Sequence, residues 1–370
     1  MKILFTGGGS GGHIFPIIAV AREIRRIYNG KNLRFFYLGP KDDFGEILLS
    51  QEGIKIKTIL SGKIRRYLNW QSFWQNLIDV LFKIPLGVVQ AYFHLFFLAP
   101  DLIFAKGGFG SLSGVISGWI LGIPIFLHES DVSPGLANKF LSRFSQKVFV
   151  SFSKTEYFSL QKMILTGNPV RKEILEGSPE EARSLFKITG RKPVVLVLGG
   201  SQGSQRINDR MLEILPEFLN NFELIHQTGE KNFSEVKAES QAVTNQDSAI
   251  YYHPFPFLKE TELKQALALA DLIVSRAGSG SIFEIASSSK PSILIPLPGA
   301  AQDHQIKNAY AFAQTGASIV LEEENFTPNF FLEKLKFLFS HPEELEKMSK
   351  AAKEFARPEA AKTIAQYLLK

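Results

Sequence analysis

The chain of 370 residues is longer than one hydrophobic core usually serves, so two domains of ordinary size are expected. Its 45% hydrophobic and 21% charged residues exclude disorder and coiled coil, and the absence of cysteine excludes disulfides and thiolate chemistry and favours a reducing compartment. A net charge of +6 admits anionic partners, but no long basic run or nucleic-acid-binding motif accompanies it, so nucleic acid is not an expected partner.

Short apolar runs that end in glycine or small polar residues recur through the first half and predict buried parallel strands. The first run, residues 2–6, is too short for a secretory signal, so we expect a cytoplasmic protein. After it, Ile14, Ile17 and Ile24 share one face of a helical pattern, which predicts a β-α-β unit. The runs are KILFTGG, LRFFYLG, IKIKTIL, LIFAKGG, IPIFLHES and KVFVSF.

A second series of such runs begins at residue 194 and comprises VVLVLGG, FELIHQTG, AIYYHPF, LIVSRAG, SILIPLP and ASIVL. Turn residues, among them Asn168-Pro169, separate the two series. We therefore predict an N-terminal domain of residues 1–168 and a C-terminal domain of residues 169–354, with a final helix at about 355–370 that packs back onto the first. The fold class is α/β, with two Rossmann-like doubly wound domains whose ligand loops face a central cleft.

The strongest motif is TGGGSGGHIFP at residues 6–16, which follows a strand and opens a helix. Glycines let the backbone approach an anion, and the N–H groups of the helix start bind phosphate close to His13. The glycines also match G-x-G-x-x-G, so an NAD-dependent oxidoreductase stays an alternative. That alternative needs an acidic residue where the second strand ends, and the strand ends at Leu38-Gly39-Pro40.

A second glycine loop, FAKGGFGSLSG at residues 104–114, is either another phosphate-binding loop or a tight turn that needs positive φ. The next strand ends in a polar cluster, with Glu129 and Asp131 followed by Asn138. Polar clusters at such strand ends commonly carry chemistry. For His128, in the same cluster, a structural hydrogen bond is the favoured interpretation.

Three further loops follow strands of the second half: GGSQGS at residues 199–204, SRAGSGSIFE at residues 275–284 and AQDHQIKNA at residues 301–309. The first presents Ser201 and backbone N–H groups to a phosphate. In the second, Glu284 either binds the two hydroxyls of a ribose or interacts with the helix N-terminus. The third offers His304 and Gln305 to sugar hydroxyls, and no metal motif accompanies these loops.

Together these motifs resemble the MurG family of GT-B glycosyltransferases over nearly the whole chain. The resemblance rests on the ordered set GGGSGGH, GGF, HES, PGLANK, GNPVR, GGSQGS, SRAGSGSIFE and DHQIKNA. It implies inverting transfer of N-acetylglucosamine from UDP-N-acetylglucosamine to undecaprenyl-diphosphate-linked N-acetylmuramoyl-pentapeptide, without a cofactor. It also implies that the first domain binds the acceptor and the second the donor.

The resemblance further implies site residues, each by its place in a motif. Its acceptor-binding residues are Gly11, Gly12, His13, Gly107, Gly108, Asp131 and Asn138. Its donor-binding residues are Ser10, Gly11, Arg171, Ser201, Leu258, Gly280, Ser281, Glu284, His304 and Gln305. His13 and Glu129 are its catalytic residues, and either can be the general base. The chain departs from the family pattern at Asp131, where many members have asparagine, and at His304, where some have glutamine.

Residues 73–99 are dense in aromatic and aliphatic side chains and follow a basic stretch that begins at Lys63. Because Asp79, Lys83 and Pro85 interrupt the segment, we expect no transmembrane helix. It is either a core helix or a surface that docks peripherally on an anionic membrane, at the cytoplasmic face of the plasma membrane. A non-catalytic nucleotide-sugar-binding protein is the third functional alternative.

Overall fold

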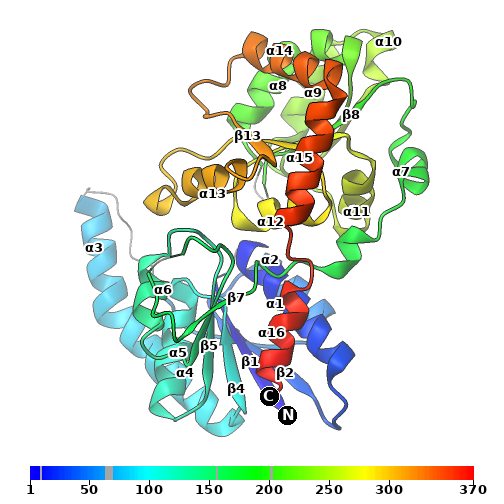
Figure 1. Cartoon of the computed structure of the whole chain (residues 1–370). Helices are drawn as coiled ribbons and strands as arrows, with labels where there is room; N and C mark the ends of the chain where they lie inside the picture. Colours follow the sequence, from blue (N-terminus) through cyan, green and yellow to red (C-terminus); the bar gives the residue numbers. More distant parts are fainter. Residues whose placement is uncertain (9–10, 63–69, 156, 201–202) are drawn as a thin grey trace. The chain divides into compact units, whose positions relative to one another are not determined.

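The computed structural model describes residues 1–8, 11–62, 70–155, 157–200 and 203–370, without the side chains of residues 71–73. The chain forms two compact units. Unit 1 comprises Met1–Pro169 and Glu359–Lys370, and unit 2 comprises Val170–Pro358. Figure 1 shows the helices and strands of both units.

Unit 1 alternates strands with helices along the chain. Its strands are β1 (Lys2–Thr6), β2 (Arg34–Gly39), β3 (Lys55–Thr58), β4 (Leu102–Ala105), β5 (Ile125–Glu129), β6 (Lys147–Val150) and β7 (Met163–Leu165). Its helices are α1 (Gly11–Ile27), α2 (Asp43–Gln51), α3 (Trp70–Ile78), the π-helix η1 (Asp79–Lys83), α4 (Ile84–Leu98), η2 (Phe109–Ser111), α5 (Leu112–Ile120), α6 (Leu136–Leu141) and α16 (Ala360–Leu368). The runs read from the sequence each contain a strand, whereas β7, only three residues long, was not predicted.

The strands of unit 1 form one parallel sheet in the order β3-β2-β1-β4-β5-β6-β7. Phe5 of β1 lies opposite Tyr37 of β2 and Phe104 of β4. The order of the strands reverses at the neighbouring pair β1 and β4, and the loops that leave these two strands diverge. In open α/β sheets such a switch point is where ligands bind.

Helices cover both faces of this sheet. The predicted apolar face of α1 is confirmed, since Ile14, Ile17 and Ile24 are buried in one cluster with Phe5. The C-terminal helix α16 contributes Ile364 to the same cluster and lies beside α1 (Figure 1). On the other face α4 and α5 pack against each other over a second apolar cluster.

The segment from α3 through η1 to α4 is one continuous helical stretch that runs past Asp79, Lys83 and Pro85. Asp79 is buried and pairs with Lys83 at 2.6 Å, which lets both charges remain in an apolar helix. Pro85 is the second residue of α4, which begins directly after the π-helical turn. By length and composition alone, Trp74–Leu98 is long and apolar enough to cross a membrane.

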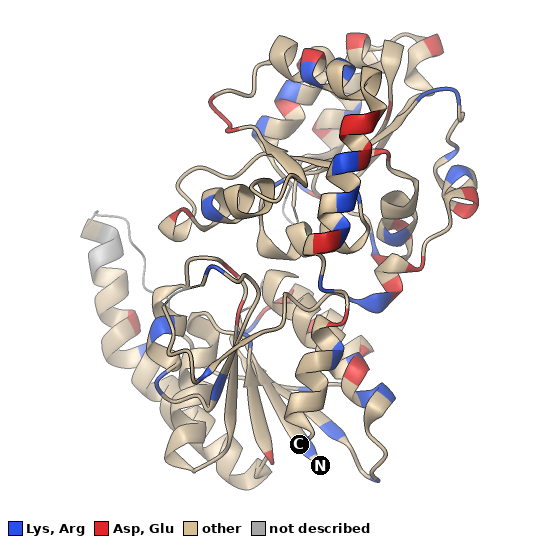
Figure 2. Ribbon diagram, in the orientation of Figure 1, with Lys and Arg blue, Asp and Glu red and all other residues tan. Residues whose placement is uncertain are grey.

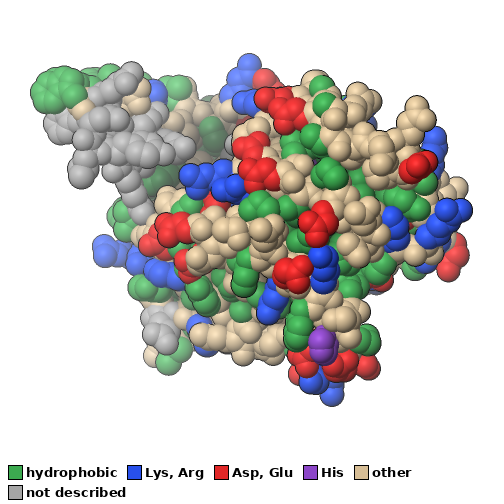
Figure 3. Space-filling view, turned by 90° about the horizontal axis from the view of Figure 1, so that it is seen from above, with side chains coloured by type: hydrophobic (Ala, Val, Ile, Leu, Met, Phe, Trp, Pro, Cys, Tyr) green, Lys and Arg blue, Asp and Glu red, His purple; other side chains and the backbone are tan. Residues whose placement is uncertain are grey.

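The helical stretch from α3 to α4 is packed against unit 1 on one side and exposed on the other, so it is not a core helix. Gly87 sits where a side chain would overlap the carbonyl oxygen of Leu60, so α4 packs closely against unit 1 on that side. The opposite side carries apolar residues at helical spacing that are 52 to 80% exposed, here named the apolar outer face: Phe82, Leu86, Val89, Phe93 and Phe97. Figure 2 shows the stretch almost free of charge, and in Figure 3 hydrophobic side chains gather at the end of α3.

Unit 2 has the same alternation of strands and helices. Its strands are β8 (Val194–Leu198), β9 (Glu223–Gln227), β10 (Tyr252–Phe255), β11 (Leu272–Ser275), β12 (Ser292–Leu294) and β13 (Ser318–Val320). Its helices are η3 (Lys172–Leu175), α7 (Pro179–Phe186), α8 (Gln205–Asn221), α9 (Phe233–Val243), α10 (Gln246–Ala249), α11 (Glu260–Leu269), α12 (Ser279–Ser287), η4 (Ala301–Asp303), α13 (His304–Ala313), α14 (Pro328–Ser340) and α15 (Pro342–Phe355).

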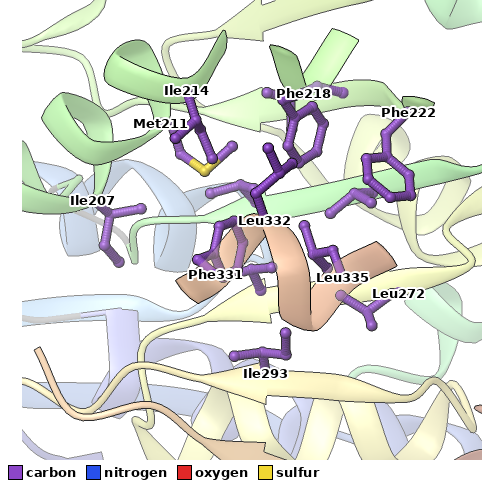
Figure 4. Close-up of a cluster of buried hydrophobic side chains, with 14 of the residues drawn as sticks. Ile207, Met211, Ile214, Phe218, Phe222, Leu272, Ile293, Phe331, Leu332 and Leu335 are labelled. Atoms are coloured by element: carbon purple, nitrogen blue, oxygen red, sulfur yellow. The ribbon is translucent and has the colours of Figure 1, made fainter. Parts of the chain in front are cut away.

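The strands of unit 2 are parallel in the order β10-β9-β8-β11-β12-β13, which repeats the order of the first six strands of unit 1. Its core lies between the sheet and helices α8 and α14. Figure 4 shows Phe218 and Met211 of α8 meeting Leu332 of α14 above Leu272 and Ile293 of the sheet. The predicted α/β class, with two doubly wound parallel domains, is therefore confirmed.

Candidate active site

The predicted motif loops leave the central strand pair of each sheet. In unit 1 the two glycine loops follow β1 and β4, and in unit 2 the loops at residues 199–204 and 276–284 follow β8 and β11. These pairs are the switch points of the two sheets, where parallel strands leave a crevice at their carboxyl ends. Each unit therefore brings two of the predicted loops to its ligand-binding edge.

The two glycine loops of unit 1 pack backbone to backbone. A Cβ at Gly110 would overlap the carbonyl oxygen of Gly7, and one at Gly107 would overlap the amide of Asn138. Gly107 and Gly108 also have φ of +91° and +75°. The interpretation of the second loop as a tight turn that needs glycine is therefore correct.

His13 lies in the first turn of α1 with its ring between the two glycine loops. A Cβ at Gly8 would lie 3.1 Å from Nδ1 of the ring, and one at Gly108 would lie 3.0 Å from Nε2. The side chain stays partly accessible. Desolvation, followed by the positive charge of Lys106, lowers the pKa of His13 to about 4. The imidazole is therefore neutral near pH 7 and can accept a proton.

Glu129 ends β5 and is buried, and each of its carboxylate oxygens accepts a hydrogen bond. The backbone N–H of Asp131 donates to Oε1 at 2.9 Å, and Nδ2 of Asn138 donates to Oε2 at 2.8 Å. The Oδ1 of Asn138 accepts from the N–H of Gly108 at 2.9 Å, which joins Glu129 to the second glycine loop. Burial, followed by the charge of Asp131, raises the pKa of Glu129 above its ordinary value.

The structure separates His128 from this group. Its Nε2 lies 3.3 Å from the carbonyl oxygen of Gly167, and the side chain is fully buried. The structural interpretation of His128 therefore agrees with its surroundings. Asp131 is the second residue after the strand and is half-buried. Gly11 and Gly12 are the first two residues of α1, and Ser10 lies outside the described residues.

Tyr37 supports the first glycine loop and was missed in the sequence. Its hydroxyl, on β2, donates to the carbonyl oxygens of Gly7 at 3.0 Å and Gly8 at 3.3 Å. A dinucleotide-binding domain uses an acidic residue at the end of this strand to bind a ribose. Here Tyr37, near the end of this strand, holds the first glycine loop instead. The end of the strand is therefore unsuited to the ribose contact that the dinucleotide alternative needs. An aromatic residue near the end of a predicted second strand was the available signal.

In unit 2 the loop after β8 turns through Gly200 and Gly203, which have φ of +88° and +77°. Gln227 holds it, because its Nε2 donates to the carbonyl oxygen of Gly200 at 3.0 Å while its Oε1 accepts from the N–H of Leu258 at 3.0 Å. Gln227 was not predicted, and it links two predicted donor-binding segments. The side chain of Leu258 is buried, and Ser201 lies outside the described residues.

The buried side chain of Arg276 holds the far end of the loop after β8 by hydrogen bonds. Arg276 donates to Oγ of Ser204, the N-cap residue of α8, at 2.6 Å, and to Oε2 of Glu323 at 2.8 Å. It also donates to the carbonyl oxygen of Ile295 at 3.2 Å, and Arg206 donates to the other oxygen of Glu323 at 3.0 Å. The loops after β8, β11, β12 and β13 therefore meet at one guanidinium.

Two predicted donor-binding residues form an ion pair in unit 2. Arg171 is buried and donates to Oε1 of Glu284 at 3.4 Å and to Oε2 of Glu260 at 3.0 Å. Glu284 is the sixth residue of α12, beyond the first turn in which a helix N-terminus acts on a carboxylate, so that interpretation does not hold. Burial raises the pKa of Glu284, and Arg171 opposes this effect.

The remaining predicted donor residues lie at two helix starts. Gly280 and Ser281 belong to the first turn of α12, and no atom would meet a Cβ at Gly280 within 4 Å. His304 opens α13 with its Nδ1 2.8 Å from the carbonyl oxygen of Ala301. Gln305 accepts a hydrogen bond from the N–H of Leu297 at 3.0 Å, which uses its oxygen to hold the preceding loop.

No group of side chains suited to a metal ion occurs among the residues that the structure describes. The residues present are instead cations, glycine loops and helix starts, which bind phosphate, together with acidic and amide groups that bind hydroxyls. In each unit these groups are of the kinds that suit a phosphorylated, hydroxyl-rich ligand.

Comparison with known proteins identifies the family. Residues 3–150 match the glycosyltransferase family 28 N-terminal domain, and residues 194–364 match the glycosyltransferase family 28 C-terminal domain. The chain is 38% identical, over 99% of both chains, to a Bacillus cereus protein named UDP-N-acetylglucosamine--N-acetylmuramyl-(pentapeptide) pyrophosphoryl-undecaprenol N-acetylglucosamine transferase 2. A Treponema denticola transferase of that name, without the final number, is 35% identical over 99% of this chain and 96% of its own.

Solved structures agree in fold. MurG of Acinetobacter baumannii has a TM-score of 0.74 at 24% identity, with 100% of this chain and 99% of that chain covered. UDP-GlcNAc 2-epimerase of Neisseria meningitidis, bound to UDP-GlcNAc, has a TM-score of 0.67 at 16% identity, with both chains fully covered. These two likenesses bear on the fold alone, which is GT-B. With the domain matches and the relatives, the resemblance seen in the sequence is confirmed: the chain belongs to glycosyltransferase family 28.

Proposed function

We propose that this chain transfers N-acetylglucosamine from UDP-N-acetylglucosamine to the 4-hydroxyl of the muramoyl sugar in undecaprenyl-diphosphate-linked N-acetylmuramoyl-pentapeptide. The observation that carries the proposal is the 38% identity, over 99% of both chains, to a relative named for this transfer. In this proposal unit 1 binds the acceptor and unit 2 the UDP-sugar. The ion pair between Arg171 and Glu284 supports the second assignment, since it places a cation that can bind phosphate beside a carboxylate that can bind hydroxyls.

The reaction is an inverting displacement. The acceptor oxygen bonds to the anomeric carbon, the bond from that carbon to the phosphate oxygen of UDP breaks, and the acceptor proton passes to a base. UDP leaves with the electron pair of the broken bond. The first turn of α12, with Gly280 and Ser281, and the Arg171 guanidinium are the groups that would stabilise the charge developing on the diphosphate.

Two residues of unit 1 are candidates for the base. His13 is partly accessible, but its low pKa makes it a weak base. Glu129 is buried, and its raised pKa is better matched to neutral pH. The hydrogen bond from Asn138 and the N–H of Asp131 hold the Glu129 carboxylate in one orientation. The accessibility of the side chain therefore favours His13 as the base, and the pKa favours Glu129. The pH profiles of variants decide between the two residues.

Peripheral attachment to an anionic membrane is part of the proposal, at the cytoplasmic face where the lipid-linked acceptor would be presented. The apolar outer face supports it, because exposed apolar residues at helical spacing are what an interfacial helix inserts into a bilayer. Docking is favoured over spanning since α4 packs against α5 on its inner side and is covered there by protein. The basic residues Lys63, Arg65 and Arg66 lie outside the described residues.

A transfer assay tests the proposed function. Radiolabelled UDP-N-acetylglucosamine and a synthetic prenyl-diphosphate muramoyl-pentapeptide should give label in the lipid fraction, with UDP released in equal amount. Tight donor binding without transfer would identify a non-catalytic binding protein instead. Stabilisation by NAD but not by UDP-N-acetylglucosamine in a thermal shift assay would favour the oxidoreductase alternative.

A further inference from the structure

The side chain of Gln227, the last residue of β9, bridges two segments that the proposed function uses for the donor. Its Nε2 donates to the carbonyl oxygen of Gly200, in the loop after β8, and its Oε1 accepts from the N–H of Leu258, each at 3.0 Å. A backbone carbonyl only accepts and a backbone N–H only donates, so these partners fix the orientation of the carboxamide. Gln227 is 6% exposed, so little water reaches either hydrogen bond.

The backbone around Gln227 connects the same two segments. The N–H of Gly199 donates to the carbonyl oxygen of Gln227 at 3.4 Å, and the N–H of Thr228 donates to that of Phe255, at the end of β10, at 2.9 Å. A Cβ at Gly203 would overlap the carbonyl oxygen of Thr228, so the loop after β8 packs directly on this strand end. The end of β9 therefore lies between that loop and the segment of residues 255–258.

Leu258 in turn precedes the charged group of the donor site. It lies two residues before Glu260, the first residue of α11. Glu260 pairs with Arg171 at 3.0 Å, and Arg171 pairs with Glu284 at 3.4 Å. The hydrogen bond from the N–H of Leu258 to Gln227 thus holds the start of α11, and with it this group of charges, relative to the loop after β8.

We propose that Gln227 is a positioning residue of the donor site, which sets the distance between the loop after β8 and the segment at Leu258 so that one nucleoside diphosphate can bind both. The inference rests on the proposed function, in which the loop offers N–H groups to phosphate and the apolar side chain of Leu258 contacts the base. Phosphate and base are the opposite ends of UDP. A ligand that contacts two segments binds more tightly when both are already held at its own length, because less of the protein is ordered on binding.

Two other roles for Gln227 make different predictions. If it only stabilises unit 2, its loss lowers the unfolding temperature and leaves the affinity of the folded protein for UDP unchanged. If it supports the segment at Leu258 alone, its loss weakens the binding of UDP and of uridine by the same factor. As a spacer between the two segments it predicts a loss for UDP, which reaches both, and a smaller loss for uridine, which lacks the phosphates.

Two variants of Gln227 and one control separate these roles. Gln227→Met keeps the length of the side chain without either hydrogen bond. Gln227→Glu, ionised at pH 8.5, keeps an acceptor for the N–H of Leu258 but has no N–H for the carbonyl oxygen of Gly200. Ile225→Val shortens a fully buried side chain of the same strand, so it lowers stability and leaves both hydrogen bonds in place.

The measured quantity is the ratio of the Kd of uridine to the Kd of UDP at pH 8.5, with UDP titrated by calorimetry and uridine by ligand-observed NMR. Loss of a buried hydrogen bond should lower this ratio by about tenfold in both Gln227 variants, mainly because UDP binds more weakly. Ile225→Val should keep the wild-type ratio. An unchanged ratio in folded Gln227→Met and Gln227→Glu would overturn the proposal.

Hydrogen exchange without ligand keeps this inference distinct from the proposed function. The amide of Leu258 should exchange slowly in the wild type and in Gln227→Glu, and faster in Gln227→Met. Equal protection in all three proteins would overturn the role of the bridge even if transfer is confirmed. Absence of UDP binding by the wild type would instead refute the donor assignment of unit 2, and the inference with it. If neither Gln227 variant folds while Ile225→Val does, the carboxamide serves folding and the proposal fails.

Discussion

Arg171 and Glu284 form an ion pair in unit 2, with Nη2 of the arginine 3.4 Å from Oε1 of the carboxylate. The family resemblance assigns both residues to the donor site, with Glu284 as the candidate ligand of the ribose hydroxyls. Glu260 lies 3.0 Å from the other terminal nitrogen of Arg171, so two carboxylates share one guanidinium. Since burial raises the pKa of Glu284, the arginine is the group that favours its charged form.

Replacing Glu284 should weaken donor binding specifically. Charge-assisted hydrogen bonds are worth about 1.5 to 3 kcal/mol, so Glu284→Ala should raise the Kd of UDP-N-acetylglucosamine by about 10- to 150-fold in titration calorimetry. Acceptor affinity should barely change. The wild type should bind a 2′-deoxyuridine donor poorly, whereas Glu284→Ala should scarcely distinguish it from the ribose donor. Glu260→Gln is the matched control, because it alters the surroundings of Arg171 and should preserve discrimination between the donors. Equal discrimination by wild type and Glu284→Ala would mean that Glu284 does not contact the ribose.

Donor binding should also depend on pH through Glu284. Its pKa in the folded protein is raised, so the carboxylate takes up a proton at a higher pH than an exposed glutamate does. The Kd of the donor should therefore increase as pH falls through this raised pKa, and Glu284→Gln should be weak at all pH values with a flatter profile. Calorimetry between pH 4.5 and 8 measures this directly. Profiles of equal slope for both proteins would place the titrating group elsewhere.

The general base should be identified by two substitutions. If His13 is the base, His13→Gln lowers kcat by about 100-fold or more and removes an acidic limb set by a pKa near 4. If Glu129 is the base, Glu129→Gln removes a limb at higher pH, since the pKa of this carboxylate is raised. Stopped assays of kcat and kcat/KM from pH 4 to 9 compare both variants with the wild type. Retention of the acidic limb in both would exclude each residue as the base.

Much of the fold follows from local patterns in the sequence. Apolar runs that end in glycine mark buried parallel strands, and the glycine loops after them mark the switch points of both sheets. The strand β7 was missed because its three residues, Met163–Leu165, are too few to show a pattern. Asp79 and Lys83 led to the expectation that residues 73–99 contain no transmembrane helix, because a charge is costly in an apolar helix, while in three dimensions Asp79 pairs with Lys83 one turn later.

The supporting residues of the site could not be predicted because their partners are distant in the chain. Arg276 reaches Ser204 and Glu323, which are 72 and 47 residues away. Tyr37 holds a loop whose residues lie 29 and 30 positions before it. A motif is a local pattern, so it identifies the residues of one loop that can contact a ligand. The residues that hold this loop in place come from other segments, and only the pairing of the strands brings them near it. The ion pair between Arg171 and Glu284 could not be predicted for the same reason, since 113 positions separate the two residues.

The ion pair between Arg276 and Glu323 should contribute both to the stability of unit 2 and to its affinity for the donor. The side chain of Glu323 is 4% exposed, and removing one partner of a buried ion pair leaves a charge uncompensated, at about 3 to 5 kcal/mol. Glu323→Ala should therefore lower the thermal unfolding temperature and weaken binding of UDP-N-acetylglucosamine, because the loop at Ser204 loses its support. The exposed neighbour Glu324→Ala is the matched control and should change neither. A stable Glu323→Ala protein with normal donor affinity would contradict this role.

The apolar outer face should attach the protein to membranes without taking part in the chemistry. Phe93 and Phe97 are 54 and 80% exposed, and full transfer of such a ring from water is worth about 1.5 to 3 kcal/mol. Replacing both with serine should weaken binding to vesicles of anionic phospholipid by at least about tenfold, with activity on a short, water-soluble acceptor nearly unchanged. Phe330→Ser with Phe337→Ser, two exposed positions of unit 2, is the matched control and should bind vesicles as the wild type does.

High salt should also weaken binding, since each lysine or arginine near anionic lipid contributes about 1 kcal/mol that salt screens. Wild-type protein that resists extraction at high salt and alkaline pH would instead indicate a spanning helix at Trp74–Leu98.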